Sequence, residues 1–372
     1  MRTPAYLDHN ATSPLRPAAF DVMVEALQVG GNPSAVHSSG RKARSLVDAA
    51  RRRVAALVGC LPIEIIFTSG GTEANSMALR GSRRRRVLVS AVEHDSVLKA
   101  SPGAEIIPVD GDGVVDLQAL QEMLARATEP SLVSVMLANN ETGVIQPVRD
   151  VVRLARRAGA LIHCDAVQAA GKLAFDVHGL GVDYLSVSAH KLGGPTGVGA
   201  LFARSEAPLM PDRCGGGQEA NRRAGTENVA GIAGFGAAAE TAGNTLPLGA
   251  LRDRLETSLL RIAPEARVLG VGAPRLDNTS CISMPGVKAE TQVMALDLAG
   301  VCVSAGAACS SGKVQRSAVL DAMGVAPAEA GSAIRISLGW NTQSSDIDRL
   351  IAAWRDLYIR AGKSDIDDAR AA

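Results

Sequence analysis

The fold is indicated most clearly by residues 161–191, which read LIHCDAVQAAGKLAFDVHGLGVDYLSVSAHK. Two short apolar runs, residues 161–163 and 184–187, are separated by a segment of helix length. Strands spaced in this way form βαβ units, in which the strands pair in parallel and the helices cover the sheet. The same alternation continues to both sides of this stretch, with further apolar runs at residues 65–67, 87–89, 106–109, 133–137 and 199–202. We therefore predict an α/β fold with a mainly parallel central sheet.

The pattern changes after about residue 240. Helices are expected at residues 248–262 and 345–361, with strands near residues 278–284, 301–303 and 332–338. We predict a smaller α+β domain formed by residues 1–13 and 246–372, beside a large domain of residues 14–245. The boundary rests on the Ala-Gly-Asn-Thr-Leu-Pro stretch at residues 242–247, whose composition favours a turn.

Length and charge narrow the classes of protein that the chain can belong to. Its 372 residues, 47% of them hydrophobic, suit two globular domains. A net charge of +1 gives no overall field for a polyanion, and the one basic run, Arg83–Arg86, has no interleaved aromatic residues. We interpret that run as a solvated turn. No stretch is long and apolar enough for a membrane span, and no apolar signal segment is present. We expect a cytoplasmic protein without nucleic-acid or membrane partners.

One lysine differs from the others in its surroundings. Seven of the 39 basic residues are lysines, and six of them sit among polar or charged neighbours, as surface lysines do. Lys191 instead follows an apolar strand and precedes the Gly-Gly-Pro turn at residues 193–195. An amine at the end of a buried strand can form an imine with an aldehyde cofactor, because desolvation lowers its pKa. A loop lysine with its ammonium in water is an equal alternative from this segment alone.

Two further strand ends carry polar groups. Asp165 closes an apolar strand, and a buried carboxylate needs a partner such as a protonated pyridine nitrogen. An Asp together with an imine-forming Lys is typical of pyridoxal-phosphate chemistry. The segment Thr68–Asn75 places two glycines and the hydroxyls of Ser69 and Thr72 at the start of a helix, where a phosphate can bind. Helix capping is the alternative for both Asp165 and this segment.

The cysteines point to free thiols. The six are not spaced as C-x-x-C, which argues against a disulfide framework and against a zinc site, so we predict no metal. Cys309 lies in a run of small residues, 304–312, that we expect to form a mobile loop. An exposed thiol there can become a nucleophilic thiolate, unlike Cys302 on the preceding strand, which we expect to be buried. A chance cysteine in a flexible loop is an equal alternative.

Together, and in this order, these pieces resemble the class V, fold-type I family of pyridoxal-phosphate-dependent transferases, in particular its cysteine desulfurases of the NifS/IscS type. The likeness covers nearly the whole chain. The matching motifs are Tyr6–Thr12, Gly31–His37, Glu93–His94, Asn139–Gly143, Asp165–Gln168, Ser188–Lys191, Arg223–Asn228 and Ile334–Leu338.

The resemblance implies pyridoxal 5′-phosphate as cofactor and a role for each matching residue. Lys191 would hold the cofactor as a Schiff base, His94 would stack on its ring and shuttle protons, and Asp165 would pair with the ring nitrogen. Gln168 would contact the 3′-oxygen. The phosphate side would be bound by a set of four residues, namely Gly71, Thr72, Ser188 and His190. Thr226 would reach the phosphate of the neighbouring subunit's cofactor, which implies a homodimer.

The resemblance also implies the reaction. Asn140 would position the substrate on the cofactor, and Arg335 would clamp the substrate carboxylate through a planar, bidentate guanidinium. L-cysteine would become L-alanine, and Cys309 would take the sulfur as a persulfide for an acceptor or scaffold protein, in iron–sulfur cluster or other thio-cofactor biosynthesis.

Three departures from the family pattern affect mainly the expected rate and the docking of partners. The usual Ser-Gly-Ser-Ala-Cys reads Ala-Gly-Ala-Ala-Cys at residues 305–309, Ala220-Asn221 replaces a common Arg-Gly, and Trp340 stands where Arg is frequent.

Three alternative functions stay open at this point. The first is a class V aminotransferase, which needs no Cys309, and the second is a selenocysteine lyase. The third is a non-catalytic scaffold, which would not need Lys191 or Asp165.

Overall fold

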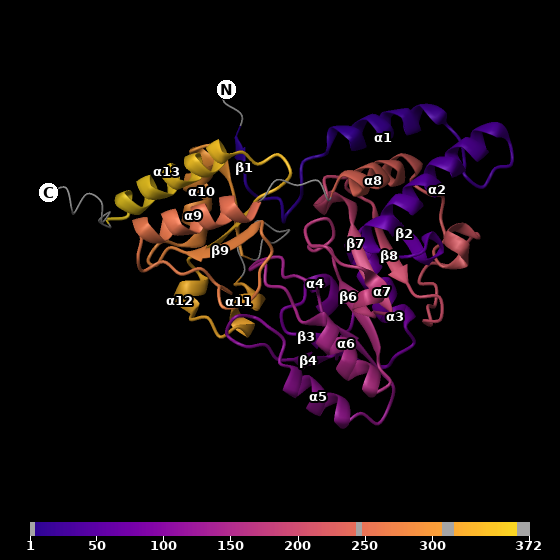
Figure 1. The fold of residues 1–372 in the computed structure, drawn as a ribbon, viewed down its shortest axis with the longest axis horizontal. Coiled ribbons are helices and arrows are strands. Elements are labelled where there is room, and N and C mark those ends of the chain that lie inside the picture. Colours follow the sequence, from indigo (N-terminus) through magenta and orange to yellow (C-terminus); the bar gives the residue numbers. More distant parts are fainter. Residues whose placement is uncertain (1–3, 243–247, 307–315, 363–372) are drawn as a thin grey trace.

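The chain forms two bodies that meet along one side (Figure 1). The computed structural model describes residues 4–242, 248–306 and 316–362. The body on the right of Figure 1 contains, in chain order, α1 (Pro17–Val29), α2 (Ser38–Val58), β2 (Ile65–Thr68), α3 (Gly71–Gly81), β3 (Arg86–Ser90), α4 (Asp95–Leu98), β4 (Glu105–Ile107), α5 (Leu117–Ala125), β5 (Ser131–Ser134), α6 (Val148–Arg157), β6 (Leu161–Asp165), α7 (Val177–Leu180), β7 (Tyr184–Ser188), β8 (Gly199–Ala203) and α8 (Val229–Thr241).

A seven-stranded sheet with the order β2-β8-β7-β6-β5-β3-β4 is the centre of this body. All neighbouring strands are parallel except β8, which is antiparallel to both β2 and β7. The carboxyl ends of β2, β3, β5, β6 and β7 therefore lie along one edge of the sheet. The prediction of an α/β fold with a mainly parallel sheet is confirmed.

Both faces of this sheet are covered by helices, which explains why its strands are apolar at successive positions. On β3, Leu88 belongs to the large cluster that also contains buried residues of α2, α5, α6 and α8. The next residue, Val89, packs on the opposite face with Met77 of α3 and Val97 of α4. The same alternation on the other strands gives each face of the sheet its own core.

The second body, at the left of Figure 1, is built around the antiparallel sheet β11-β12-β9. Its elements are α9 (Leu248–Ile262), β9 (Thr279–Ser283), α10 (Ala289–Leu298), β10 (Val301–Cys302), β11 (Ser304–Ala305), α11 (Ala318–Ala322), α12 (Pro327–Ala330), β12 (Ala333–Ser337) and α13 (Ser344–Arg360). The first strand of the chain, β1 (Ala5–Tyr6), pairs in parallel with β10. The N-terminal segment thus pairs with this body. The division into a large domain of residues 14–245 and a small domain of residues 1–13 and 246–372 stays a prediction.

Some local predictions need correction. β5 ends at Ser134, and residues 135–137 run on beside β6 through hydrogen bonds from Val135 N to His163 O and from Leu137 N to Asp165 O. Arg86 is not part of a solvated turn, since it begins β3 and forms an ion pair with Glu105. Cys302 is only half-buried on β10.

Candidate active site

The carboxyl ends of the parallel strands border a cavity of about 490 Å³, which the second body completes through β12 and the residues around α11. Ligands collect at this edge of parallel sheets. The predicted site residues that line the cavity are Gly71, Thr72, His94, Asn140, Asp165, Gln168, Ser188, His190, Lys191 and Arg335. Thr226 is exposed and does not line it. Cys309 lies outside the described residues.

Lys191 is placed by β7 and the 3₁₀ turn Ala189–Lys191 that follows it. Its Nζ donates to two backbone oxygens, Asn10 O at 2.6 Å and Ala11 O at 2.7 Å. Burial, with the nearby Arg335 guanidinium, lowers the pKa of this amine from 10.5 to about 8. A lysine in this state has an appreciable neutral fraction near neutral pH and can act as a nucleophile.

Asp165 is the last residue of β6, and its carboxylate is buried. One oxygen, Oδ2, accepts from Asn75 Nδ2 at 2.7 Å, and the other, Oδ1, accepts from Val167 N at 2.9 Å. These two hydrogen bonds fix the orientation of the Asp165 carboxyl group, which lines the cavity. Sequence reasoning missed Asn75, which reaches the cavity from the second turn of α3.

A candidate anion site lies at the N-terminus of α3, an eleven-residue helix. Gly71 is its first residue, and a Cβ there would come within 2.7 Å of Val167 Cγ2, so only glycine lets the backbone lie this close to the floor of the cavity. The free N–H groups of the first turn, together with Thr72, face the cavity. Ser69, predicted as a further donor, is exposed and does not line it.

Two histidines, His94 and His190, line the cavity. His94 is the N-cap of α4, and its Nδ1 accepts from Ser96 N at 3.1 Å, so the neutral ring carries its proton on Nε2. His190 Nδ1 lies 3.1 Å from Thr12 Oγ1. Burial and the positive charges of Lys191 and Lys172 lower the pKa of His190 from 6.5 to about 4. His190 is therefore neutral at physiological pH.

Arg335 enters the cavity from β12 of the second body. Its Nη2 forms a 2.9 Å ion pair with Asp8, and its Nη1 donates to Asn140 O at 3.1 Å. The guanidinium is almost fully buried, and its Nε has no hydrogen-bond partner among the described residues. A buried, partly unsatisfied guanidinium is suited to bind a carboxylate.

Glu93 also lines the cavity, and no role was predicted for it. Burial, with the Asp165 charge nearby, raises the pKa of its carboxyl well above 4.5. Its Oε1 accepts from Met136 N at 2.6 Å, whereas Oε2 is buried without a partner among the described residues. The Glu93–His94 motif contained the signal, but sequence alone gives no reason for a carboxyl of raised pKa.

The expectation that Lys172 is a surface lysine was wrong. Its Nζ donates to Gln168 Oε1 at 2.7 Å and to Asn10 Oδ1 at 2.9 Å. Burial and the nearby charges of Lys191 and Arg335 hold its pKa well below 10.5. Asn10, which the sequence flagged only as part of a motif, thus receives hydrogen bonds from both lysines.

Comparison with known proteins decides the family. The class V aminotransferase family model matches residues 5–350. A cysteine desulfurase of Cereibacter sphaeroides is 47% identical over 93% of each chain, and an IscS-like cysteine desulfurase of Mycobacterium tuberculosis is 38% identical over 97% of this chain and 98% of its own. This chain belongs to the class V aminotransferases, in their cysteine desulfurase group. The X-ray structure of a NifS-like protein from Rickettsia africae superposes with a TM-score of 0.89, at 34% identity over 96% of this chain and 100% of that chain.

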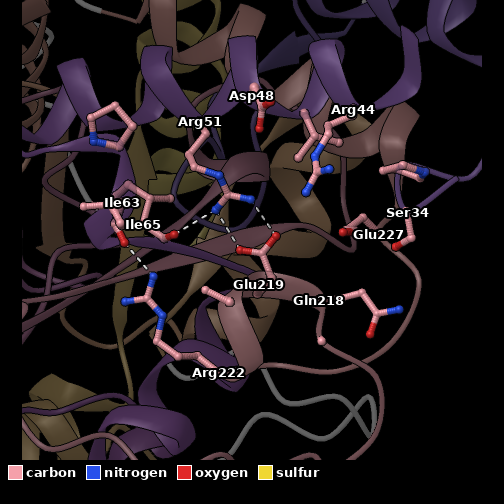
Figure 2. A pocket seen from close by; sticks show the side chains of 15 residues that line it. Ser34, Arg44, Asp48, Arg51, Ile63, Ile65, Gln218, Glu219, Arg222 and Glu227 are labelled. Carbon is pink, nitrogen blue, oxygen red and sulfur yellow. Dashed lines mark hydrogen bonds and ion pairs between the residues drawn. The ribbon is translucent and has the colours of Figure 1, made fainter. Parts of the chain in front are cut away.

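This class V aminotransferase chain has a second pocket, of about 310 Å³, between α2 and residues 217–227 (Figure 2). Arg51 forms two hydrogen bonds with Glu219, both of 2.7 Å, and donates to Ile65 O at 2.8 Å. Glu219 Oε2 also accepts from Phe67 N at 2.9 Å. These contacts attach the segment around Glu219 to β2, and none of the residues predicted for the active site lines this pocket.

The same segment explains one departure from the family pattern. Glu219, Ala220 and Asn221 have φ angles of 47°, 54° and 63°. The left-handed region suits glycine best and asparagine next, so Asn221 can replace the common Gly at little cost. Ala220 has no such tolerance and stores strain in this turn.

The described residues of this class V aminotransferase chain contain neither a membrane-spanning helix nor a cluster of metal ligands. Among residues 4–242, 248–306 and 316–362, no helix has the length and apolarity needed to cross a bilayer. In the same ranges, no group of three or more His, Cys, Asp or Glu side chains is arranged to hold a metal ion.

Proposed function

We propose that the protein is a pyridoxal-phosphate-dependent cysteine desulfurase that converts L-cysteine to L-alanine and collects the sulfur on Cys309 as a persulfide. The observation that carries this proposal is the convergence of Lys191, Asp165 and Arg335 on one cavity. These three side chains supply an amine of lowered pKa, a carboxylate and a guanidinium. Membership of the cysteine desulfurase group supports the choice of substrate.

The cavity fits the cofactor because groups that line it correspond to the cofactor's parts. The phosphate has a counterpart in the helix N-terminus at Gly71 and Thr72, with Ser188 and neutral His190 beside it. The ring nitrogen has a counterpart in the carboxylate of Asp165. When bound, pyridoxal phosphate supplies an electron sink for a substrate carbanion.

Residues of the chain itself would bind the substrate and transfer its proton. With a pKa of about 8, Lys191 is neutral in roughly a tenth of molecules at pH 7, so its Nζ can hold the cofactor and later take the substrate's Cα proton. Arg335 would bind the substrate carboxylate through its unsatisfied Nε–H, while Asp8 keeps the guanidinium in place. The backbone contact of Arg335 with Asn140 brings these two predicted substrate-binding residues together.

Sulfur transfer would take place at Cys309. A bond forms between the Cys309 Sγ and the substrate sulfur, the substrate's C–S bond breaks, and Cβ gains a proton to give alanine. Cysteine and one thiol are thus converted into alanine and one persulfide, with no external oxidant. The described residues on either side of the Cys309 segment, Gly306 and Arg316, both line the cavity, which supports delivery of Cys309 to the substrate.

The assembly and pathway belong to the same proposal. The exposed position of Thr226 is compatible with a homodimer in which it reaches the partner's cofactor. The persulfide would pass to an acceptor or scaffold protein of the cytoplasm, for iron–sulfur cluster or other thio-cofactor biosynthesis.

The test is a product assay on protein loaded with pyridoxal phosphate. L-cysteine and a thiol reductant are supplied, and alanine and sulfide are measured for the wild type and for Cys309→Ser. Equal amounts of the two products from the wild type, and almost none from a cofactor-loaded Cys309→Ser, are expected. Full activity of Cys309→Ser, or transamination of another amino acid without alanine production from cysteine, would contradict the proposal.

A further inference from the structure

Lys172 is a second enclosed lysine beside the active site, and its surroundings differ from those of a structural ion pair. Its two hydrogen-bond acceptors, Gln168 Oε1 and Asn10 Oδ1, are both neutral amide oxygens. Among the described residues, no carboxylate forms an ion pair with it. Since burying an amine without a counter-charge is costly, a purely structural role would be better served by an apolar side chain.

The contact with Lys172 determines how the amide of Gln168 is turned. A lysine Nζ donates hydrogen bonds, so the Gln168 atom 2.7 Å from it is the oxygen. The other end of the amide lies 2.9 Å from the carbonyl oxygen of Asn10, which can only accept, so that end is the nitrogen. Both contacts select the same orientation, and the second N–H of Gln168 is left for a group in the cavity that Gln168 lines.

We propose that Lys172 is a positioning residue, which holds Gln168 Oε1 so that the Gln168 N–H is directed at the 3′-oxygen of the cofactor. This inference rests on the proposed function, because it assumes that pyridoxal phosphate occupies the cavity. A donor on the 3′-oxygen weakens the hold of that oxygen on the proton of the neighbouring Lys191 nitrogen. The bound cofactor should therefore lose this proton at a lower pH when Gln168 is correctly turned.

Other charges also act on the Lys191 nitrogen, so the test must separate them from Gln168. Arg335 lowers the pKa of Lys191, whereas Asp8 and Asp165 raise it. His190, beside Lys191, is neutral at physiological pH, and burial together with the Asp165 charge raises the pKa of Glu93. Lys172 itself, when charged, would repel a protonated Lys191 nitrogen directly. A double-mutant cycle with Gln168 distinguishes this direct effect from an effect through the amide.

The experiment follows the visible absorption of the cofactor-loaded protein as a function of pH. Lys172→Met is compared with wild type, with Gln168→Leu and with the double variant, and the dissociation constant of pyridoxal phosphate is measured for each. Lys172→Met should raise the pH midpoint by about half a unit and weaken cofactor binding about fivefold, the effect of one lost hydrogen bond. Gln168→Leu should shift both quantities at least as far, and the double variant should match Gln168→Leu.

Two controls keep the outcome interpretable. Lys288→Met removes an exposed lysine from the second body and should leave the midpoint unchanged. Lys172→Gln keeps an N–H donor on a shorter side chain, so its pH midpoint should lie between those of wild type and Lys172→Met. If Lys172→Met does not fold, Lys172→Gln takes its place in the double-mutant cycle.

The inference is overturned if a folded Lys172→Met titrates like wild type, or if it causes the same shift in the Gln168→Leu background, which would show a direct charge effect. A wild type that binds no pyridoxal phosphate would instead defeat the proposed function itself.

Discussion

The Arg51–Glu219 ion pair in the pocket beside α2 and the charged side chains at the active-site cavity differ in how far the protein itself satisfies their hydrogen bonds. In the pocket of Figure 2, the carboxylate of Glu219 accepts two hydrogen bonds from Arg51 and one from the backbone of β2. Arg222 Nε and Glu227 Oε2, from two other residues that line this pocket, have no partner among the described residues, so the comparison concerns the Arg51–Glu219 pair. Beside the cavity, Lys172 has only neutral acceptors among the described residues, and in the cavity Glu93 Oε2 and Arg335 Nε have no partner there.

We interpret the Arg51–Glu219 pair as structural and the unpartnered groups of the cavity as functional. A buried ion pair with complete hydrogen bonding is satisfied by the protein alone and needs nothing from solution. Buried groups that lack partners and have shifted pKa values are typical of sites that bind ligands and carry out reactions. We therefore expect substitutions in the pocket to change stability, and substitutions in the cavity to change chemistry.

The largest effect is expected for Lys191→Ala. Without the amine, the cofactor has no covalent anchor and the Cα proton has no base, so alanine formation from cysteine should fall by at least about 10³-fold. The thermal midpoint of the apoprotein should be equal to or higher than that of wild type, because a buried amine is removed. Lys288→Ala serves as the matched control. If Lys191→Ala kept activity within tenfold of wild type, the functional role assigned to the charged groups of the cavity would be wrong.

The next effect contrasts two buried glutamates. Glu219→Gln leaves Arg51 without its charged partner and should lower the free energy of unfolding by about 3 kcal/mol. Glu93→Gln removes a carboxyl whose pKa is raised by burial, and such a group lowers stability above its unfolded-state pKa, so stability at pH 7 should be unchanged or raised. Urea unfolding of the two apoproteins measures both values, and equal losses would remove the distinction between pocket and cavity.

Acid sensitivity should be linked to His163, which lies two residues before Asp165. Among the described residues, its ring nitrogens form hydrogen bonds with the hydroxyls of Ser134 and Ser186, and burial lowers its pKa from 6.5 to about 3. Between these values the unfolded chain binds the proton more strongly, so His163 lowers stability as pH falls from 6.5 towards 3, by up to about 1.4 kcal/mol per pH unit. His163→Gln should show a shallower decline of the unfolding free energy over this range; an identical slope would assign the acid sensitivity elsewhere.

The smallest effect is expected at Ala220, in the segment that the pocket anchors. Its φ of 54° strains an alanine but not a glycine. Ala220→Gly should raise the free energy of unfolding by about 0.5 kcal/mol, after the greater entropy of glycine in the unfolded chain is subtracted. Cofactor affinity should not change. A loss of stability in calorimetry would show that the turn is unstrained.

The sequence predicts the sheet and the two central site residues for one physical reason. Parallel strands end at a common edge, so polar residues that follow apolar runs, such as Asp165 and Lys191, converge without any knowledge of tertiary contacts. The helix N-terminus at Gly71 is found by the same reasoning. Family resemblance was needed for residues such as Arg335, because β12 belongs to the second body and nothing local indicates where it docks.

The remaining contacts depend on groups far apart in the sequence. Lys172 looks like a surface lysine among its neighbours, and only the return of the N-terminal segment at Asn10, 162 positions earlier, encloses it. Asn75 and Glu93 are ordinary helix and loop residues until Asp165 is placed between them. The role of Thr226 depends on a second subunit and stays a prediction.

The central claim is that the cavity binds pyridoxal phosphate through Lys191. It is tested most directly by reducing the cofactor-loaded protein with borohydride, which makes the link to the amine permanent, and then sequencing the labelled peptide by mass spectrometry. Our account predicts a single cofactor adduct on Lys191 and none on Lys172. An adduct on Lys172, or a protein that retains no cofactor at all, would contradict it.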